Sequence, residues 1–220
     1  MLTLRITDGL CMNLRVAVFA SGGGSNFQAI AENALNYRVT LVVCNRSRAG
    51  VLDRARALDV PAHVLSPRAF ESDKLYANAL IDLLHAEKID LIALAGYLCK
   101  IPVPVVEAFW GRILNIHPAL LPRFGGKGLY GHRVHKAVLE AKESFSGATV
   151  HFVDEEYDTG PILLQKKVPV LPDDTPDSLA GRVLAVEHKI FPEAIDLIAQ
   201  GRVQIKGRRV TIQPIKTHDD

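Results

Sequence analysis

An asparagine and a histidine stand two residues apart in the stretch LNIHPALLP, residues 114–122. In a β-strand, residues i and i+2 project to the same side, so the side chains of Asn115 and His117 are expected to face one space. The asparagine amide donates hydrogen bonds to a carbonyl oxygen, and the histidine imidazole titrates near neutral pH. Together the two groups can hold a carbonyl and stabilise its oxygen as it becomes negative.

Several carboxylates follow downstream in HFVDEEYDTGP, residues 151–161. Asp158 stands directly before Thr159-Gly160-Pro161 and is part of the turn chemistry, whereas the acidic run at 154–156 is more simply a set of solvated turn charges. A carboxylate near His117 is expected to raise the pKa of the imidazole and to favour its charged form. A charged His117 would be a better donor to a developing oxyanion.

A glycine turn, SGGGSN at residues 21–26, follows the apolar run LRVAVFA and precedes a helical pattern. Backbone amides and the helix dipole favour an anion at such a position, and Ser25 and Asn26 favour a single phosphate monoester. The turn lacks the G-K-[ST] ending of a P-loop. It also fails the dinucleotide pattern G-x-G-x-x-G, because Phe27 stands where the third glycine should be.

An NADP-dependent reductase stays open as an alternative on these residues. The second strand pattern ends in Asn45-Arg46-Ser47-Arg48, and an arginine there can accommodate the 2′-phosphate of NADP. Against this function, the chain holds no Tyr-x-x-x-Lys pair. Glycine is also favoured in a tight strand-to-helix turn that binds nothing.

The candidate site residues are positioned by strands and helices that alternate along the chain. Buried strands are predicted at 14–20, 39–45, 61–66 and 90–96 and in RILNIH, and helices at 27–35, 51–59, 71–87, 135–143 and 177–201. Uniformly apolar strands that alternate with helices indicate a parallel sheet covered on both faces. Hairpins are predicted from 147–153 with 161–170 and at the turn Lys206-Gly207, so the α/β fold is Rossmann-like with a mostly parallel mixed sheet.

The composition of the chain limits the classes of partner, cofactor and cellular location to be considered. The chain has 220 residues, and 26 Lys plus Arg balance 24 Asp plus Glu, so nothing calls for a nucleic-acid or membrane partner. Three scattered cysteines suggest neither disulfides nor a thiolate metal site, and a cytoplasmic location is expected. We expect residues 1–12 to be an extension of uncertain order and residues 13–220 to form a single domain.

The order and spacing of four blocks, SGGGSN, LIALAGYLCKI, ILNIHPALLP and HFVDEEYDTGPILLQ, resemble the glycinamide ribonucleotide formyltransferases of purine synthesis. The similarity runs from about residue 14 to about residue 200. The resemblance implies the formyltransferase fold and an enzyme that moves the formyl group of 10-formyltetrahydrofolate to the amine of glycinamide ribonucleotide. It implies no metal or redox cofactor, and a monomer or homodimer.

The resemblance also implies roles residue by residue. The catalytic residues of the family fall on Asn115, His117 and Asp158. Its phosphate and ribose contacts match Gly24, Ser25, Asn26 and Glu187. Its folate pocket matches Leu98, Cys99, Lys100 and Ile101 together with Asn115, and the turn at 153–158 is expected to close over that pocket.

Two departures from the family bear on the site. Many relatives carry arginine where this chain has Cys99, which leaves the partner of the folate glutamate tail open. The segment RFGGKGLYGHRVH is longer and richer in glycine than in many bacterial members. His132 and His135 within it have no acidic or thiol neighbour in the sequence, so we expect no metal there and place His135 near the site.

Two further functions stay possible at this point. A formyltetrahydrofolate hydrolase shares the Asn, His and Asp set, but that class usually carries an N-terminal regulatory domain. The other is the NADP-dependent reductase described above.

Overall fold

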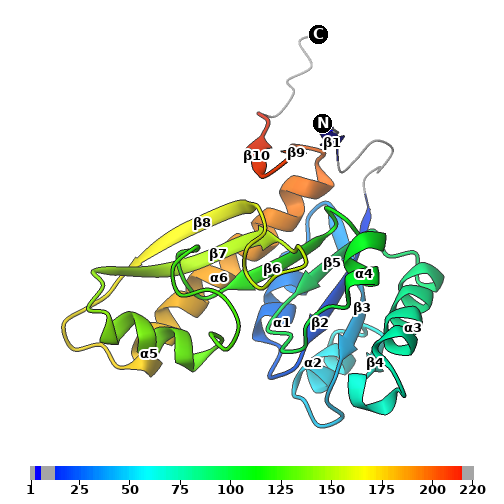
Figure 1. Cartoon of the computed structure of the whole chain (residues 1–220), viewed down its shortest axis with the longest axis horizontal. Coiled ribbons are helices and arrows are strands. Elements are labelled where there is room, and N and C mark those ends of the chain that lie inside the picture. The colour runs from blue at the N-terminus through cyan, green and yellow to red at the C-terminus, as the bar shows by residue number, and fades with distance from the viewer. Residues whose placement is uncertain (1–2, 6–12, 215–220) are drawn as a thin grey trace.

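The computed structural model describes residues 3–5 and 13–214, and its centre is a seven-stranded sheet (Figure 1). The strands are β2 (Leu14–Ala20), β3 (Tyr37–Cys44), β4 (Ala62–Val64), β5 (Leu91–Leu94), β6 (Ile113–His117), β7 (Phe145–Phe152) and β8 (Ile162–Pro169). Their order is β4-β3-β2-β5-β6-β7-β8. The pairs from β4 to β6 are parallel, whereas β7 runs antiparallel to both β6 and β8. The predicted mixed sheet is confirmed.

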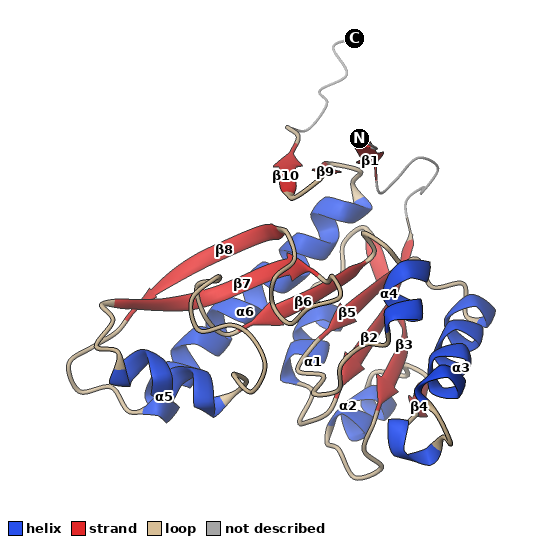
Figure 2. Ribbon diagram, in the orientation of Figure 1, coloured by secondary structure: helices blue, strands red, loops and turns tan. Residues whose placement is uncertain are grey.

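Helices cover both faces of this sheet (Figure 2). They are α1 (Ser25–Glu32), α2 (Val51–Ala57), α3 (Asp73–Ala86), α4 (Val103–Ala108), α5 (His132–Glu140) and α6 (Pro176–Ala199), with a 3-10 turn at Pro67–Ala69. One core lies between the sheet and α1, α2, α5 and α6, and a second lies under α3 and α4. Of the helices in the described ranges, none is both long and apolar enough to cross a membrane.

Strand β2 shows why its sequence is apolar throughout. Val16 and Val18 face the core under α1 and α6, whereas Ala17 and Phe19 face the core under α3 and α4, and all four are fully buried. A strand with helices on both sides has no solvent face, so alternation of polar and apolar residues is lost.

One helix differs from the sequence patterns. Helix α4 was not predicted, because Pro102 and Pro104 favour a loop, yet one proline precedes the helix and the other lies in its first turn, where the missing N–H costs nothing. The predicted helix at 177–201 is confirmed as α6, which continues through Pro192 for 24 residues. Ser72 caps α3, since its side chain accepts a hydrogen bond from the Leu75 amide.

A second, small sheet joins β1 (Thr3–Arg5), β9 (Val203–Lys206) and β10 (Arg209–Ile212) in the order β1-β9-β10. The predicted terminal hairpin at Lys206-Gly207 is therefore confirmed. Residues 3–5 pair antiparallel with β9, whereas residues 1–2 and 6–12 lie outside the described part of the chain. The proposed boundary between an extension at 1–12 and a domain at 13–220 stays a prediction.

Replacing Leu80→Ala tests the core under α3. Leu80 is fully buried, so the variant should lose about 2–5 kcal/mol of unfolding free energy through lost burial and a cavity. Urea unfolding followed by circular dichroism measures this loss. Leu75→Ala on the same helix is the control, because Leu75 is 48% exposed and should lose far less. Equal losses in the two variants would contradict the packing described here.

Candidate active site

The carboxyl end of β6 presents Asn115 and His117 on one side of the sheet, as their spacing predicts. The chain then turns away at Pro118. Across the ladder, β7 runs antiparallel and places His151 directly opposite Asn115. The ligand side of this sheet is therefore bounded by side chains from two neighbouring strands, at the end where open α/β sheets bind their ligands.

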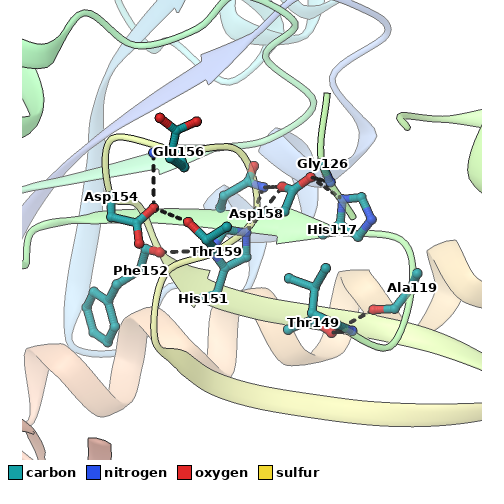
Figure 3. A network of polar contacts seen from close by, with 12 residues as sticks. His117, Ala119, Gly126, Thr149, His151, Phe152, Asp154, Glu156, Asp158 and Thr159 are labelled. Atoms are coloured by element: carbon teal, nitrogen blue, oxygen red, sulfur yellow. Dashed lines mark hydrogen bonds and ion pairs between the residues drawn. The ribbon is translucent and has the colours of Figure 1, made fainter. Parts of the chain in front are cut away.

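Asp158 completes the cluster from the loop between β7 and β8 (Figure 3). One carboxylate oxygen lies 3.3 Å from the Asn115 amide nitrogen, and the other lies 3.5 Å from His117 Nδ1. The Gly126 amide donates to the same carboxylate at 2.9 Å. Asp158 has a φ of 56°, a left-handed conformation that non-glycine residues rarely adopt. The three predicted catalytic side chains are thus brought together.

The pKa of His117 departs from the sequence expectation. We expected Asp158 to raise this pKa and to favour the charged ring, but the net pKa is lowered from its ordinary value. Burial is the larger cause, since His117 is 3% exposed, and Asp158 and the Phe124 carbonyl only partly offset it. The free site therefore holds His117 mainly neutral near pH 7.

The pKa of Asp158 is lowered despite burial, which acts in the opposite direction. The nearby His151 and His117 rings and the hydrogen bond from the Gly126 amide all favour the charged carboxylate. Asp158 is therefore a lasting negative charge beside a histidine that is neutral at rest. This arrangement stabilises His117 whenever the ring gains a proton.

His151 is a member of the cluster that the sequence patterns missed. Its Nε2 lies 3.1 Å from the Asn115 amide nitrogen and 3.6 Å from Asp158. Its Nδ1 lies 2.8 Å from the Phe152 carbonyl, which only accepts, so we assign the proton to Nδ1 and the acceptor role to Nε2. The available signal was a histidine inside the apolar run GATVHFV, where burial demands a partner.

A cavity of about 520 Å³ opens beside this cluster. All five predicted folate-contact positions line it, Asn115 and the four from Leu98 to Ile101, and the predicted turn at 153–158 lines the same space. Cys99 accepts a hydrogen bond from the Asn45 amide at 2.9 Å, and the Lys100 ammonium lies 5.6 Å from the centre of the Tyr157 ring. Residues predicted to contact folate therefore share one wall with the catalytic cluster.

The glycine turn lies at the amino end of α1, and Gly24 has a φ of 80°. A Cβ on Gly24 would approach Val51 to 2.7 Å, so the position requires glycine for both conformation and space. Asn26 lines the cavity, whereas Gly24 and Ser25 are not part of its wall. The turn nevertheless leaves the first-turn amides of α1 without a side-chain cap.

Glu187 on α6 is 7% exposed and lines the same cavity. The Asn26 side-chain amide donates to it at 2.6 Å, although 161 residues separate the two. Burial raises the pKa of Glu187, and the hydrogen bond from Asn26 opposes that rise. The predicted phosphate turn and the predicted ribose contact are thus physically joined before any ligand binds.

The two histidines of the glycine-rich segment have different surroundings. His132 pairs with Asp177 of α6 at 3.2 Å, an acidic partner that the sequence alone did not reveal. His135 is 4% exposed and lines the cavity, as expected. Over residues 3–5 and 13–214, no three His, Cys, Asp or Glu side chains gather closely enough to hold a metal ion.

Comparison with known proteins shows the protein family to which this chain belongs. The formyl transferase family matches residues 14–195. The chloroplastic phosphoribosylglycinamide formyltransferase of Arabidopsis thaliana is 48% identical over 94% of this chain and 72% of its own length, and the Bacillus subtilis enzyme of that name is 39% identical over 82% and 92%. The crystal structure of glycinamide ribonucleotide transformylase 1 from Symbiobacterium toebii superposes with a TM-score of 0.87 at 43% identity, covering 94% of this chain and 96% of that one.

This chain belongs to the formyl transferase family, and it is a transferase with the formyltransferase fold. Within the family, the relatives just described carry the particular name phosphoribosylglycinamide formyltransferase or its synonym, as the resemblance predicts. Neither the hydrolase nor the NADP-dependent reductase is favoured by these relatives.

His135 makes stability depend on pH. Burial is the main cause that lowers its pKa to about 4, and nearby His132 and His117 act in the same direction. The unfolded chain takes up this proton near pH 6.5 and the folded protein only near pH 4, so stability should fall as the pH is lowered between them. The loss is at most roughly 3 kcal/mol at 1.36 kcal/mol per pKa unit.

The variant His135→Gln should show a shallower decline in unfolding free energy over this pH range, measured by urea titration at several pH values. His63→Gln on β4 is the matched control, because His63 is exposed and should keep the wild-type decline. A wild-type slope in the His135 variant would contradict the burial argument.

Proposed function

We propose that this protein transfers the formyl group of 10-formyltetrahydrofolate to the primary amine of glycinamide ribonucleotide, and that Asn115, His117 and Asp158 catalyse the step. One observation carries the assignment of residues. The Asp158 carboxylate contacts both Asn115 and His117, so a hydrogen-bond donor, a titrating ring and a fixed charge meet at one wall of the cavity.

In the proposed reaction, the ribonucleotide amine attacks the formyl carbon and the formyl oxygen becomes negative. Asn115 donates to that oxygen by giving up its 3.3 Å contact with Asp158, which is the longer of its two. His117 supplies a second donor through the N–H that the Phe124 carbonyl accepts at 2.8 Å in the free site. Two donors that are already aimed at one point stabilise the oxyanion more than water does, because they need not reorient during the reaction.

The proton released by the attacking amine must reach the folate nitrogen that leaves. Asp158 orders a water molecule that carries this proton, and its negative charge stabilises His117 whenever the ring becomes protonated. When the tetrahedral intermediate collapses, the bond between the formyl carbon and that nitrogen breaks. The products are formylglycinamide ribonucleotide and tetrahydrofolate. Atoms and net charge are the same on both sides of the reaction.

The folate is assigned to the cavity, and the ribonucleotide to the cavity and the glycine turn beside it. Leu98, Cys99, Lys100 and Ile101, with the turn at 153–158, bind the folate. The amino end of α1 at Gly24, Ser25 and Asn26 binds the phosphate, and Glu187 accepts hydrogen bonds from the ribose. Three observations support this assignment. Gly24 adopts a positive φ that glycine tolerates, and the first amides of α1 have no side-chain cap. Asn26 also donates a hydrogen bond to Glu187. A monomer or homodimer and a cytoplasmic location stay predictions.

The direct test follows tetrahydrofolate formation from 10-formyltetrahydrofolate with and without glycinamide ribonucleotide. Product that forms only when the ribonucleotide is present supports the transferase. Product without the ribonucleotide, together with formate, would assign a hydrolase instead. No product under either condition would contradict both.

Removing the catalytic groups should lower kcat far more than it raises KM. Asn115→Ala deletes one oxyanion donor and should cost on the order of 10²–10³ in kcat. His117→Ala and Asp158→Asn should each cost on the order of 10²–10⁴. Steady-state kinetics measures both parameters, and near wild-type kcat in any of the three variants would remove that residue from the proposed mechanism.

The phosphate site is tested by Ser25→Asp. A carboxylate in the first turn of α1 is compatible with the helix dipole, so the protein should fold, but it should repel the phosphate and raise KM for the ribonucleotide by about tenfold or more. KM for the folate should stay the same. Ser72→Asp is the matched control, since it adds the same charge at the amino end of α3, a helix to which no part of the ribonucleotide is assigned. An unchanged ribonucleotide KM would contradict the phosphate assignment.

A further inference from the structure

The loop that presents Asp158 is closed by its own hydrogen bonds. One carboxylate oxygen of Asp154 accepts from the Thr159 hydroxyl at 2.7 Å and from the Glu156 amide at 3.3 Å (Figure 3). These bonds tie the start of the turn to its end, with Asp158 directly before Thr159. The position of the Asp158 carboxylate therefore depends on how firmly the ends of this turn are held.

This turn has two internal sources of strain. Asp154, Glu155 and Glu156 are consecutive carboxylates, and like charges at this spacing repel one another. Asp158 itself adopts a φ of 56°, which costs free energy for a residue other than glycine. Contacts from outside the turn are needed to hold such a conformation.

Arg208 supplies such contacts from the turn between β9 and β10. One guanidinium nitrogen donates to the Thr159 carbonyl, and another lies 3.6 Å from the Asp154 oxygen that the internal hydrogen bonds leave free. Arg208 thus contacts both ends of the turn with one rigid group. Its charge also offsets the acidic run.

The hairpin of β9 and β10 that carries Arg208 is itself firmly held. Strand β9 is paired on both sides, by β1 and by β10. Val203 and Ile205 of β9 are 2% and 8% exposed and belong to the core beneath α6. Strand β10 also lies against β8, the strand that follows the loop (Figure 1).

We infer that Arg208 is a positioning residue for the reaction: it holds the 154–159 turn from the terminal hairpin and so keeps the Asp158 carboxylate against Asn115 and His117. This inference rests on the proposed function for its kinetic consequence. Its structural consequence is independent of activity, because the Gly126 amide donates to Asp158 and reports where that carboxylate lies.

The first experiment measures hydrogen exchange of the Gly126 amide by NMR in the full chain. Arg208→Ala should speed this exchange by about fivefold, because the Arg208 guanidinium is 71% exposed and pairs of this kind contribute up to about a factor of five. Arg209→Ala is the matched control, since Arg209 is an exposed neighbour on the same hairpin. Equal exchange rates in the two variants would overturn the inference.

The second experiment compares kcat and KM in the same variants. Arg208→Ala should lower kcat by about three- to tenfold with both KM values nearly unchanged, since misplacing a catalytic group slows the reacting step. Arg208→Lys, which keeps the charge but not the two-pronged contact, should recover only part of the loss. Unchanged kcat, or a rise in folate KM alone, would overturn the positioning role.

These results separate the two proposals. Faster Gly126 exchange in Arg208→Ala with no formyl transfer by the wild type would support the contact of Arg208 with the 154–159 turn and contradict the proposed function. An active wild type with unaltered Gly126 exchange and kcat in Arg208→Ala would do the reverse.

Discussion

The largely buried carboxylate of Asp158 is the group on which the geometry of the site depends. It contacts Asn115 and His117 of β6, lies near His151 of β7 and accepts the Gly126 amide. A buried carboxylate without such partners would cost several kcal/mol or take up a proton. The same contacts therefore keep Asp158 ionised and fix the side chains around it. The charge is stable only while the cluster keeps this geometry.

The fold meets this requirement by joining parallel and antiparallel strands in one sheet. Parallel strands β5 and β6 deliver their ends to the ligand side, as in other doubly wound α/β proteins. The antiparallel strands β7 and β8 then add a histidine across the ladder and a loop that returns over the same end. A purely parallel sheet would require a crossover connection at this point and could not place a short carboxylate-bearing loop there.

The cavity is preorganised at its other end as well. The Asn26–Glu187 hydrogen bond joins the first helix to the last, and Glu187 stays almost fully buried. A ligand that meets these residues finds them already oriented, so less conformational entropy is lost on binding. The chain thus holds both ends of its cavity through contacts between segments that are distant in the sequence.

The sequence by itself determined the order of the strands and helices of the main sheet, apart from α4, because local periodicity is written in short stretches. It also determined the presence of Asn115, His117 and Asp158. Only the tertiary structure decided the pKa of His117, where burial outweighs the carboxylate, and the membership of His151, which faces Asn115 through strand pairing. It also decided the partners of Glu187 and Arg208. Burial and contact between distant residues arise only when the chain has folded, and no local pattern encodes their balance.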